Sequence, residues 1–286
     1  MRVTALPRVH VIGASGRSGA ALAHALLADG AEVTPVVRDP ARWQATGLAA
    51  EPRRADLNDT AALSLALRDA TAIASAAHAR HIPAILAAAP PGARFAFLGS
   101  TRRYTRWPDE HGNGVIAGET AFRESGRPGF LLHPTMIYGA QGEDNVRRLA
   151  ALLKRLPFVP LPGGGRALVQ PIYQDDVTAA LRAALTVPVT GPEVLTIAGP
   201  TALPYAGFVR AIAAAAGLTP PRIVGVPALP LIALSPLTAL PLLPRVRPAE
   251  IRRLLEDKAF DIAPARARLG FDPLPLAAGL ARTFAT

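Results

Sequence analysis

The feature that most constrains this chain is a stretch near its N-terminus, HVIGASGRSGAALAHALL, at residues 10–27. An uninterrupted apolar run leads into three glycines at three-residue spacing, Gly13, Gly16 and Gly19, and an Ala/Leu-rich helical pattern follows at once. A strand that turns this tightly into a helix is typical of the first βαβ unit of a parallel sheet. Two interpretations are open: a cradle for a nucleotide diphosphate, or a structural turn alone.

In a phosphate-binding loop each glycine of the triplet is required for a different physical reason. The first permits the tight turn, the second lets the backbone approach a pyrophosphate, and the third lets the helix pack closely on the sheet. The N–H groups at the start of the helix attract the anion. The position after the first strand favours a bound dinucleotide, and the expected contacts in this loop are Gly13, Ser15, Gly16, Arg17, Ser18 and Gly19.

The end of the second apolar run, VVRDP at residues 36–40, bears on the choice of dinucleotide. Arg38 stands where an acidic residue would otherwise hold the adenosine ribose hydroxyls, and a guanidinium there can pair with a 2′-phosphate. Arg17 can reach the same phosphate, whereas Asp39 is the ribose acid of the alternative interpretation, NAD. One acid beside two arginines leaves the local field positive, so the sequence favours NADP as cofactor over NAD.

The first half of the chain alternates between strand and helix patterns. Short apolar runs predict strands at 8–14, 32–38, 50–56, 70–77, 94–100 and 129–138. Helical patterns lie between them, at 18–29, 60–68, 81–89 and 115–125. This alternation predicts an α/β fold, a doubly wound Rossmann-type parallel sheet. We expect the dinucleotide-binding core over residues 1–140, and a smaller C-terminal, substrate-side α/β portion, interleaved with the core, over residues 141–286.

Composition excludes several classes of site. The chain has no cysteine, which rules out disulfides and thiolate metal ligands, and His78 and His81 have no evident third ligand, so no metal is expected. The net charge is +10, but the arginine pairs are scattered and no aromatic residues interleave them, so no nucleic-acid partner is expected. The first residues carry no apolar signal core, and this favours a cytoplasmic location.

Residues 225–244, GVPALPLIALSPLTALPLLP, form an apolar tract as long as a membrane span. Five prolines interrupt it, and each costs about 3 kcal/mol inside a helix, so a spanning helix is not expected. Burial under the main domain is favoured over an apolar surface for a protein partner or a bilayer. Arginines at 245, 247, 252 and 253 keep open a peripheral contact with the inner membrane.

With these residues in view, the sequence resembles the extended and atypical short-chain dehydrogenase/reductase superfamily, in its NAD-dependent epimerase/dehydratase-like group. The resemblance rests on VIGASGRSG (11–19), VVRDP (36–40), RADL (54–57), FLGST (97–101), HPTMIYG (133–139) and QPIYQDDV (170–177). Within the group it looks like the branch containing the nucleotide-binding accessory subunit of respiratory complex I. The resemblance implies that Asp56 and Leu57 contact the adenine. It also implies that Ala76 and Ala77 lie under the cofactor, and that the nicotinamide end is lined by Pro134, Thr135 and Ile137.

The resemblance also provides a test of activity. Active members of the superfamily carry Tyr-x-x-x-Lys, in which the lysine lowers the pKa of the proton-transferring tyrosine. No tyrosine of this chain has a lysine four residues later. If Glu119 is taken as the helix glutamate of the superfamily, His111 stands in the position of the tyrosine and Val115 in the position of the lysine. The remaining candidates for acid/base or carbonyl-polarising groups are Ser100, Thr101, Tyr104 and His111.

The sequence therefore leaves two functions open. The first is an oxidoreductase or isomerase that acts on a carbonyl or hydroxyl of an unknown small-molecule substrate with a non-standard acid/base group. The second is a non-catalytic protein that binds NADP(H) for a structural, sensing or assembly role. The glycine cradle is common to both.

Overall fold

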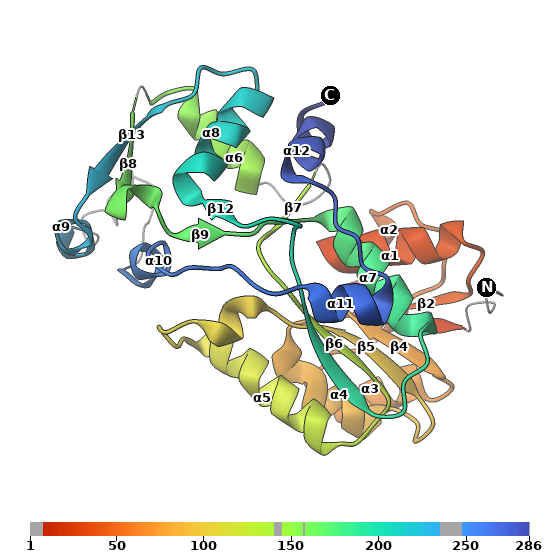
Figure 1. The fold of residues 1–286 in the computed structure, drawn as a ribbon. Helices are drawn as coiled ribbons and strands as arrows, with labels where there is room; N and C mark the ends of the chain where they lie inside the picture. The colour runs from red at the N-terminus through yellow and green to blue at the C-terminus, as the bar shows by residue number, and fades with distance from the viewer. Residues whose placement is uncertain (1–7, 140–144, 157, 235–247, 286) are drawn as a thin grey trace.

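The centre of the protein is a seven-stranded parallel sheet (Figure 1). The structure is a computed structural model, and it describes residues 8–139, 145–156, 158–234 and 248–285. The strands lie in the order β11 (Pro192–Ile197), β6 (Gly129–Pro134), β5 (Arg94–Leu98), β4 (Ala72–Ser75), β1 (Val9–Ile12), β2 (Val33–Val37) and β3 (Arg53–Arg54). The strand order reverses between β1 and β4, which confirms the doubly wound α/β fold.

Helices cover both faces of the sheet because successive side chains along each strand alternate between them. On β5, Phe95 and Phe97 face one core and Ala96 and Leu98 face the other. The first face is covered by α3 (Thr60–Leu67), α4 (Ile82–Ala88) and α5 (Glu110–Glu124). The second is covered by α1 (Arg17–Ala28), α7 (Gln174–Thr186) and α11 (Ala263–Leu269). Both faces are apolar, which explains the uninterrupted hydrophobic runs in the sequence.

The strands are shorter than the predicted runs, most of all β3 at the run 50–56, and two predicted elements differ further from the structure. The run 129–138 is divided, because Thr135 and Met136 lead the chain out of the sheet. β7 (Ile137–Tyr138) pairs instead with β10 (Ile172–Tyr173). The helix predicted at 115–125 begins at Glu110, where the Asp109 carboxylate accepts the Gly112 N–H at 2.8 Å. Three glycines among its first nine residues make the helical pattern hard to recognise in the sequence.

The C-terminal half builds a second lobe with its own apolar core, and it also returns to the sheet through α7, β11 and α11. Phe208, Val209 and Ile212 are central to this core. The strands of the lobe are β8 (Phe158–Pro162), β9 (Leu168–Val169), β12 (Leu203–Pro204) and β13 (Arg222–Val226). Its helices are η3 (Gly163–Gly165), α6 (Asn145–Leu153), α8 (Tyr205–Ala215), α9 (Ala228–Leu234), α10 (Pro248–Arg253) and α12 (Leu276–Phe284).

Part of the apolar tract falls within these elements. Its first residues end β13 and form α9, where Leu229 is 79% exposed, whereas residues 235–244 lie outside the described residues. Burial of the tract, which the sequence favours, therefore does not hold for Leu229. Within the described ranges, no helix combines the length and the apolar character that a membrane crossing requires.

Short elements occupy the carboxyl ends of the strands. These are α2 (Pro40–Gln44) after β2, η1 (Ala79–His81) after β4 and η2 (Thr101–Tyr104) after β5. The axis of α5 comes unusually close to η1, because a Cβ at Gly118 would lie 2.1 Å from the Ala79 carbonyl oxygen. Glycine at 118 is therefore what lets α5 pack against the end of β4.

We expect Gly118→Ala to lower the free energy of unfolding by about 2 kcal/mol, since the added methyl group has to displace main chain. Urea unfolding followed by circular dichroism measures this change. Gly92→Ala is the matched control, because a Cβ at position 92 meets nothing within 4 Å. An equal effect of the two substitutions would contradict the close packing of α5 on η1.

Candidate functional site

The residues that the sequence singles out for the cofactor converge on one edge of the sheet. They follow the carboxyl ends of β1, β2, β3, β4 and β6, on either side of the point where the strand order reverses. In open α/β sheets this is where a crevice for a dinucleotide forms. The group is Gly13, Ser15, Gly16, Arg17, Ser18, Gly19, Arg38, Asp56, Leu57, Ala76, Ala77, Pro134, Thr135 and Ile137.

The glycine loop has the geometry that the triplet predicts. Gly13 has a φ of +74°, and a Cβ there would lie 3.1 Å from the Ala77 nitrogen. A Cβ at Gly19 would lie 2.1 Å from the Gly13 carbonyl oxygen, so α1 starts directly against the end of β1. At Gly16 the nearest atom to such a Cβ is within the loop itself, 3.2 Å away, and the residue is exposed. The loop therefore presents bare main chain to the crevice.

The start of α1 suits an anion. No side chain caps this end, and the first turn contains no acidic residue. The Ser18 hydroxyl donates to Gln174 Oε1 of α7 at 3.1 Å, so in this geometry Ser18 offers the crevice its main-chain N–H. Uncapped N–H groups and the helix dipole attract phosphate, and the cradle therefore fits a dinucleotide pyrophosphate.

The two charged residues after β2 differ in their contacts. Arg38 is exposed at the end of the strand, whereas the Asp39 carboxylate accepts the Ala41 N–H at 3.0 Å and caps α2. After β3, Asp56 accepts the Asn58 N–H at 2.9 Å and shapes the turn that carries Leu57. Asp39 thus has a structural role that Arg38 lacks.

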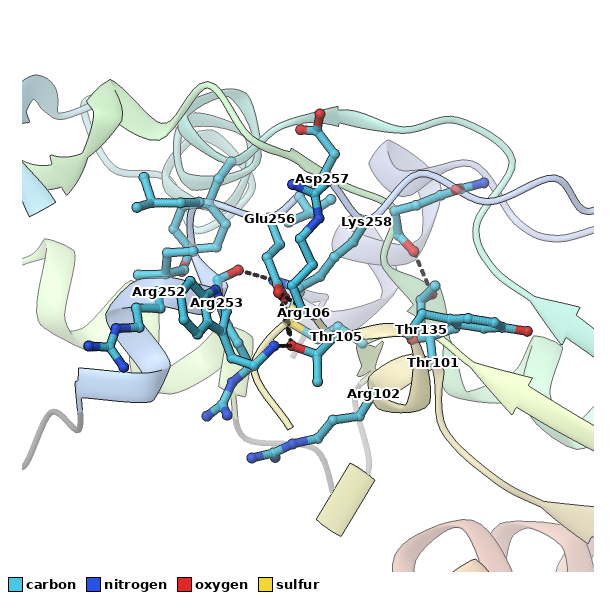
Figure 2. Close-up of a pocket in the computed structure, with 18 of the residues that line it drawn as sticks. Thr101, Arg102, Thr105, Arg106, Thr135, Arg252, Arg253, Glu256, Asp257 and Lys258 are labelled. Carbon is cyan, nitrogen blue, oxygen red and sulfur yellow. Dashed lines mark hydrogen bonds between the residues drawn. The ribbon is translucent and has the colours of Figure 1, made fainter. Parts of the chain in front are cut away.

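Beside the crevice lies a cavity of about 890 Å³, shown in Figure 2. Its floor comes from the ends of β5 and β6, including Thr101 and Thr135, and from Gln170. The opposite wall comes from the end of α10 and the segment after it, including Arg252 and Lys258. This volume is within the usual range for small-molecule sites.

Two carboxylates, Asp109 and Glu256, link the segments that form the cavity wall. Arg102 and Arg253 both bind the Asp109 carboxylate, which also caps α5. Glu256 accepts the Thr105 hydroxyl at 2.8 Å and the Arg106 N–H at 2.7 Å. These contacts hold the C-terminal wall against the loop after β5, although the two segments are about 150 residues apart in sequence.

Two further residues of the cavity wall were not apparent from the sequence. Lys258, one of two lysines in the chain, donates from Nζ to the Arg253 carbonyl, and burial lowers the pKa of its amine. The Arg252 guanidinium lies 4.9 Å from the centre of the Trp107 ring. The sequence signal for this wall was weak, because nothing in the local pattern of residues 252–260 indicates which loop it faces.

Three of the four catalytic candidates line the cavity. The Thr101 hydroxyl donates to the Pro134 carbonyl at 3.1 Å, and the Ser100 hydroxyl accepts the Arg102 N–H at 3.1 Å. The Tyr104 hydroxyl lies 3.5 Å from that of Thr196, on β11. These hydroxyls thus border the cavity but already have partners within the protein.

The fourth candidate, His111, lies apart from them. It is not among the residues that line the cavity, and its ring faces that of His78, with 4.3 Å between the ring centres. Val115, one turn further along α5, is 1% exposed within the apolar core. No group of three or more metal-binding side chains occurs within the described ranges.

A buried hydrogen-bonded pair, His133 and Glu119, fixes the loop that carries Ser100. His133 is fully buried; its Nε2 lies 2.8 Å from Glu119 Oε2, and its Nδ1 accepts the Ser100 N–H at 3.0 Å. Burial alone would raise the pKa of Glu119, but hydrogen bonds from His133 and Arg123 and the charge of Arg103 more than offset it, and the pKa falls to about 2. Glu119 therefore remains ionised at neutral pH.

The comparisons agree with this geometry. Residues 13–110 match a family of NAD(P)H-binding domains, and no curated protein matches the chain. Over residues 13–110 the chain is therefore similar to NAD(P)H-binding domains, and its Rossmann-type sheet has the fold of the solved structures described next.

Solved structures with low sequence identity share the fold over nearly the whole chain. UDP-glucuronic acid 4-epimerase from Bacillus cereus, in complex with NAD, is 16% identical with a TM-score of 0.75, covering 97% of each chain. UDP-glucose 4-epimerase from Thermus thermophilus, also with NAD, is 19% identical with a TM-score of 0.72, covering 97% of this chain and 98% of its own. MoeE5, in complex with UDP-glucose and NAD, is 20% identical with a TM-score of 0.72, covering 97% of each chain.

We expect Glu119→Ala to cost about 3 kcal/mol of stability at pH 7, because it leaves buried His133 and its neighbouring arginines without their carboxylate. The pKa of Glu119 is lower in the folded chain than its ordinary value of 4.5. Its contribution is therefore complete above pH 4.5 and is lost as the pH falls from 4.5 toward 2.

Denaturant unfolding of both proteins at pH 7 and at pH 4 measures this difference. Glu124→Ala is the control, since Glu124 ends the same helix but is exposed. A cost at pH 7 no larger than that of the control would refute the role of the pair.

Proposed function

We propose that this protein is an NADP(H)-preferring oxidoreductase or isomerase that acts on a carbonyl or hydroxyl group of a substrate bound in the cavity. The observation that supports this most directly is the position of the cavity. It begins at Ser100, Thr101 and Thr135, at the ends of the two strands that follow β4 in the sheet, beside the proposed dinucleotide crevice. A bound nicotinamide supplies hydride transfer, and the protein supplies orientation and electrostatics.

The residues after β2 support the preference for NADP. Arg38 is exposed at the mouth of the crevice, whereas the Asp39 carboxylate is engaged in capping α2. The 2′-phosphate of NADP could therefore pair with the Arg38 guanidinium. The ribose hydroxyls of NAD would lack a free carboxylate, because Asp39 already caps α2. The solved structures described above contain NAD, so the proposed preference rests on Arg38 and Asp39 and not on those structures.

We expect the protein to bind NADPH more tightly than NADH, and Arg38→Ala to weaken NADPH binding roughly tenfold or more while leaving NADH nearly unchanged. Quenching or enhancement of nicotinamide fluorescence on titration measures both affinities. Arg42→Ala, on the exposed face of α2 nearby, is the matched control. Equal affinities for the two cofactors in the unmodified protein would refute the proposed role of Arg38.

For the substrate we propose a nucleotide sugar. MoeE5, which shares the fold, is in complex with UDP-glucose. In this chain four arginines line the cavity, Arg102, Arg106, Arg252 and Arg253. Two of these are held on Asp109, which leaves Arg106 and Arg252 better placed to meet a diphosphate.

We expect UDP-glucose to change the fluorescence of Trp107, one of two tryptophans and the one that lines the cavity. Arg252→Ala is expected to weaken this binding roughly tenfold, because it removes a charged partner of the diphosphate. Arg210→Ala, exposed on α8, is the control for net charge. Binding that the Arg252 substitution leaves unchanged would contradict this orientation of the substrate.

A second function is favoured by one observation. The position that a proton-relaying lysine would occupy is Val115, which is buried in the core, so the usual route for proton transfer is absent from this helix. Without another acid/base group, the protein would bind NADP(H) for a structural, sensing or assembly role. Formation of NADPH from NADP⁺ and UDP-glucose, as a sugar hydroxyl is oxidised, or epimerisation of the sugar would decide for the enzyme.

A further inference from the structure

Two histidines that neither cofactor binding nor the cavity explains lie together at the edge of the crevice. His78 follows Ala76 and Ala77 at the carboxyl end of β4, and Ala77 is the residue that packs against Gly13 of the glycine loop. His111 is in the first turn of α5. β4 and β1 border the point where the strand order reverses, so this pair is next to the expected path of a dinucleotide.

The approach of the two rings depends on the close packing of α5. The ring planes are at 86° with centres 4.3 Å apart, in an edge-to-face arrangement. Gly114, one turn after His111, makes room for this, because a Cβ there would lie 2.9 Å from His78 Cε1. The pair therefore belongs to the packed interface between η1 and α5.

The hydrogen bonds of His78 show which ring nitrogen carries its proton. Nδ1 accepts the Arg80 N–H at 3.0 Å, so the proton of the neutral ring is on Nε2. Nε2 is buried, and it has no hydrogen-bond partner among the described residues. His78 is therefore held in one neutral tautomer, because its Nδ1 already accepts a hydrogen bond. A proton added to the two neutral rings has to bind to His111.

Burial, helped by the surrounding charges, lowers the pKa of both rings and keeps them neutral in the free protein. Burial lowers the pKa of His78 to about 4, helped by His111, Arg80 and His81 and opposed by Glu110. Burial also lowers the pKa of His111, helped by Arg102, Arg80 and Arg253 and opposed by Asp109. Arginines thus outnumber carboxylates around the pair, and an anion placed beside it would reverse this balance.

We propose that His78 and His111 form a proton-exchange site of the dinucleotide crevice, and that His111 takes up one proton from solvent when a dinucleotide binds. This inference rests on the dinucleotide binding proposed above. The pyrophosphate supplies the negative charge that stabilises the imidazolium of His111, while His78 keeps its bond to the Arg80 N–H.

Calorimetric titration with NADH tests this directly. Measured near pH 7 in two buffers of different ionisation enthalpy, the heat of binding gives the number of protons taken up. NADH is the suitable probe because its pyrophosphate does not titrate near neutral pH, whereas a phosphate monoester has a pKa near 6. We expect the uptake of about one proton, and an affinity that falls by up to about tenfold per pH unit above neutrality.

His111→Gln is expected to abolish the uptake, and His24→Gln, exposed on α1, to preserve it. His78→Asn keeps an acceptor for the Arg80 N–H, and in this variant His111 alone is expected to retain the uptake. Equal uptake by the native protein and His111→Gln would overturn the proposal but leave dinucleotide binding intact. If neither NADH nor NADPH binds, both the proposed function and the pair are refuted.

A second measurement covers the case in which His111→Gln does not fold. The native chain has six histidines, so their imidazole resonances can be titrated individually by NMR with and without NADH. The pKa of His111 is expected to rise by about two units or more when NADH is bound, from below neutrality to above it, because an opposite charge then lies close to it. An unchanged pKa would overturn the proposal.

Discussion

The contact on which the rest of the structure depends is the approach of three main-chain segments at the ends of β1 and β4. The start of α1 touches the end of β1 at Gly19 and Gly13, and Gly13 in turn touches the residue after β4, Ala77. No side chain larger than a hydrogen atom fits between α1 and β1, so the N–H groups of the helix start are held directly over the sheet edge. The crevice exists because these three segments are this close.

Close packing at glycine residues also occurs on the other face of the sheet, where it positions α5 and the histidine pair. Gly118 brings α5 against η1, and Gly114 leaves space for the His78 ring. This close packing buries Val115, and the one side chain that α5 contributes to the histidine pair is the imidazole of His111. Glu119, on the same helix, binds His133 and so holds the loop after β5 through the Ser100 N–H. One helix therefore orients the Ser100 loop and supports the histidine pair.

The cavity is assembled by contacts between distant parts of the chain. Asp109 joins Arg102 to Arg253, and Glu256 receives hydrogen bonds from Thr105 and from the Arg106 N–H. Because these carboxylates are engaged within the wall, the cavity retains a positive character at Arg106 and Arg252. This charge is the observation on which we propose an anionic substrate.

The sequence by itself determined the fold class and the cradle, because both depend on local order along the chain. Uninterrupted apolar runs fix a sheet that is covered on both faces, and Gly13, Gly16 and Gly19 require main chain to be close at the first turn. The absence of Tyr-x-x-x-Lys was also evident from the sequence alone.

The start of α5 was missed, since its glycines resemble a loop until the Asp109 cap and the contact with Ala79 are known. Only the tertiary structure decided that residues 252–260 face Thr105, that Asp39 is engaged as a cap, and that His78 meets His111. These are pairings between segments that are brought together by packing, and no local pattern encodes the partner.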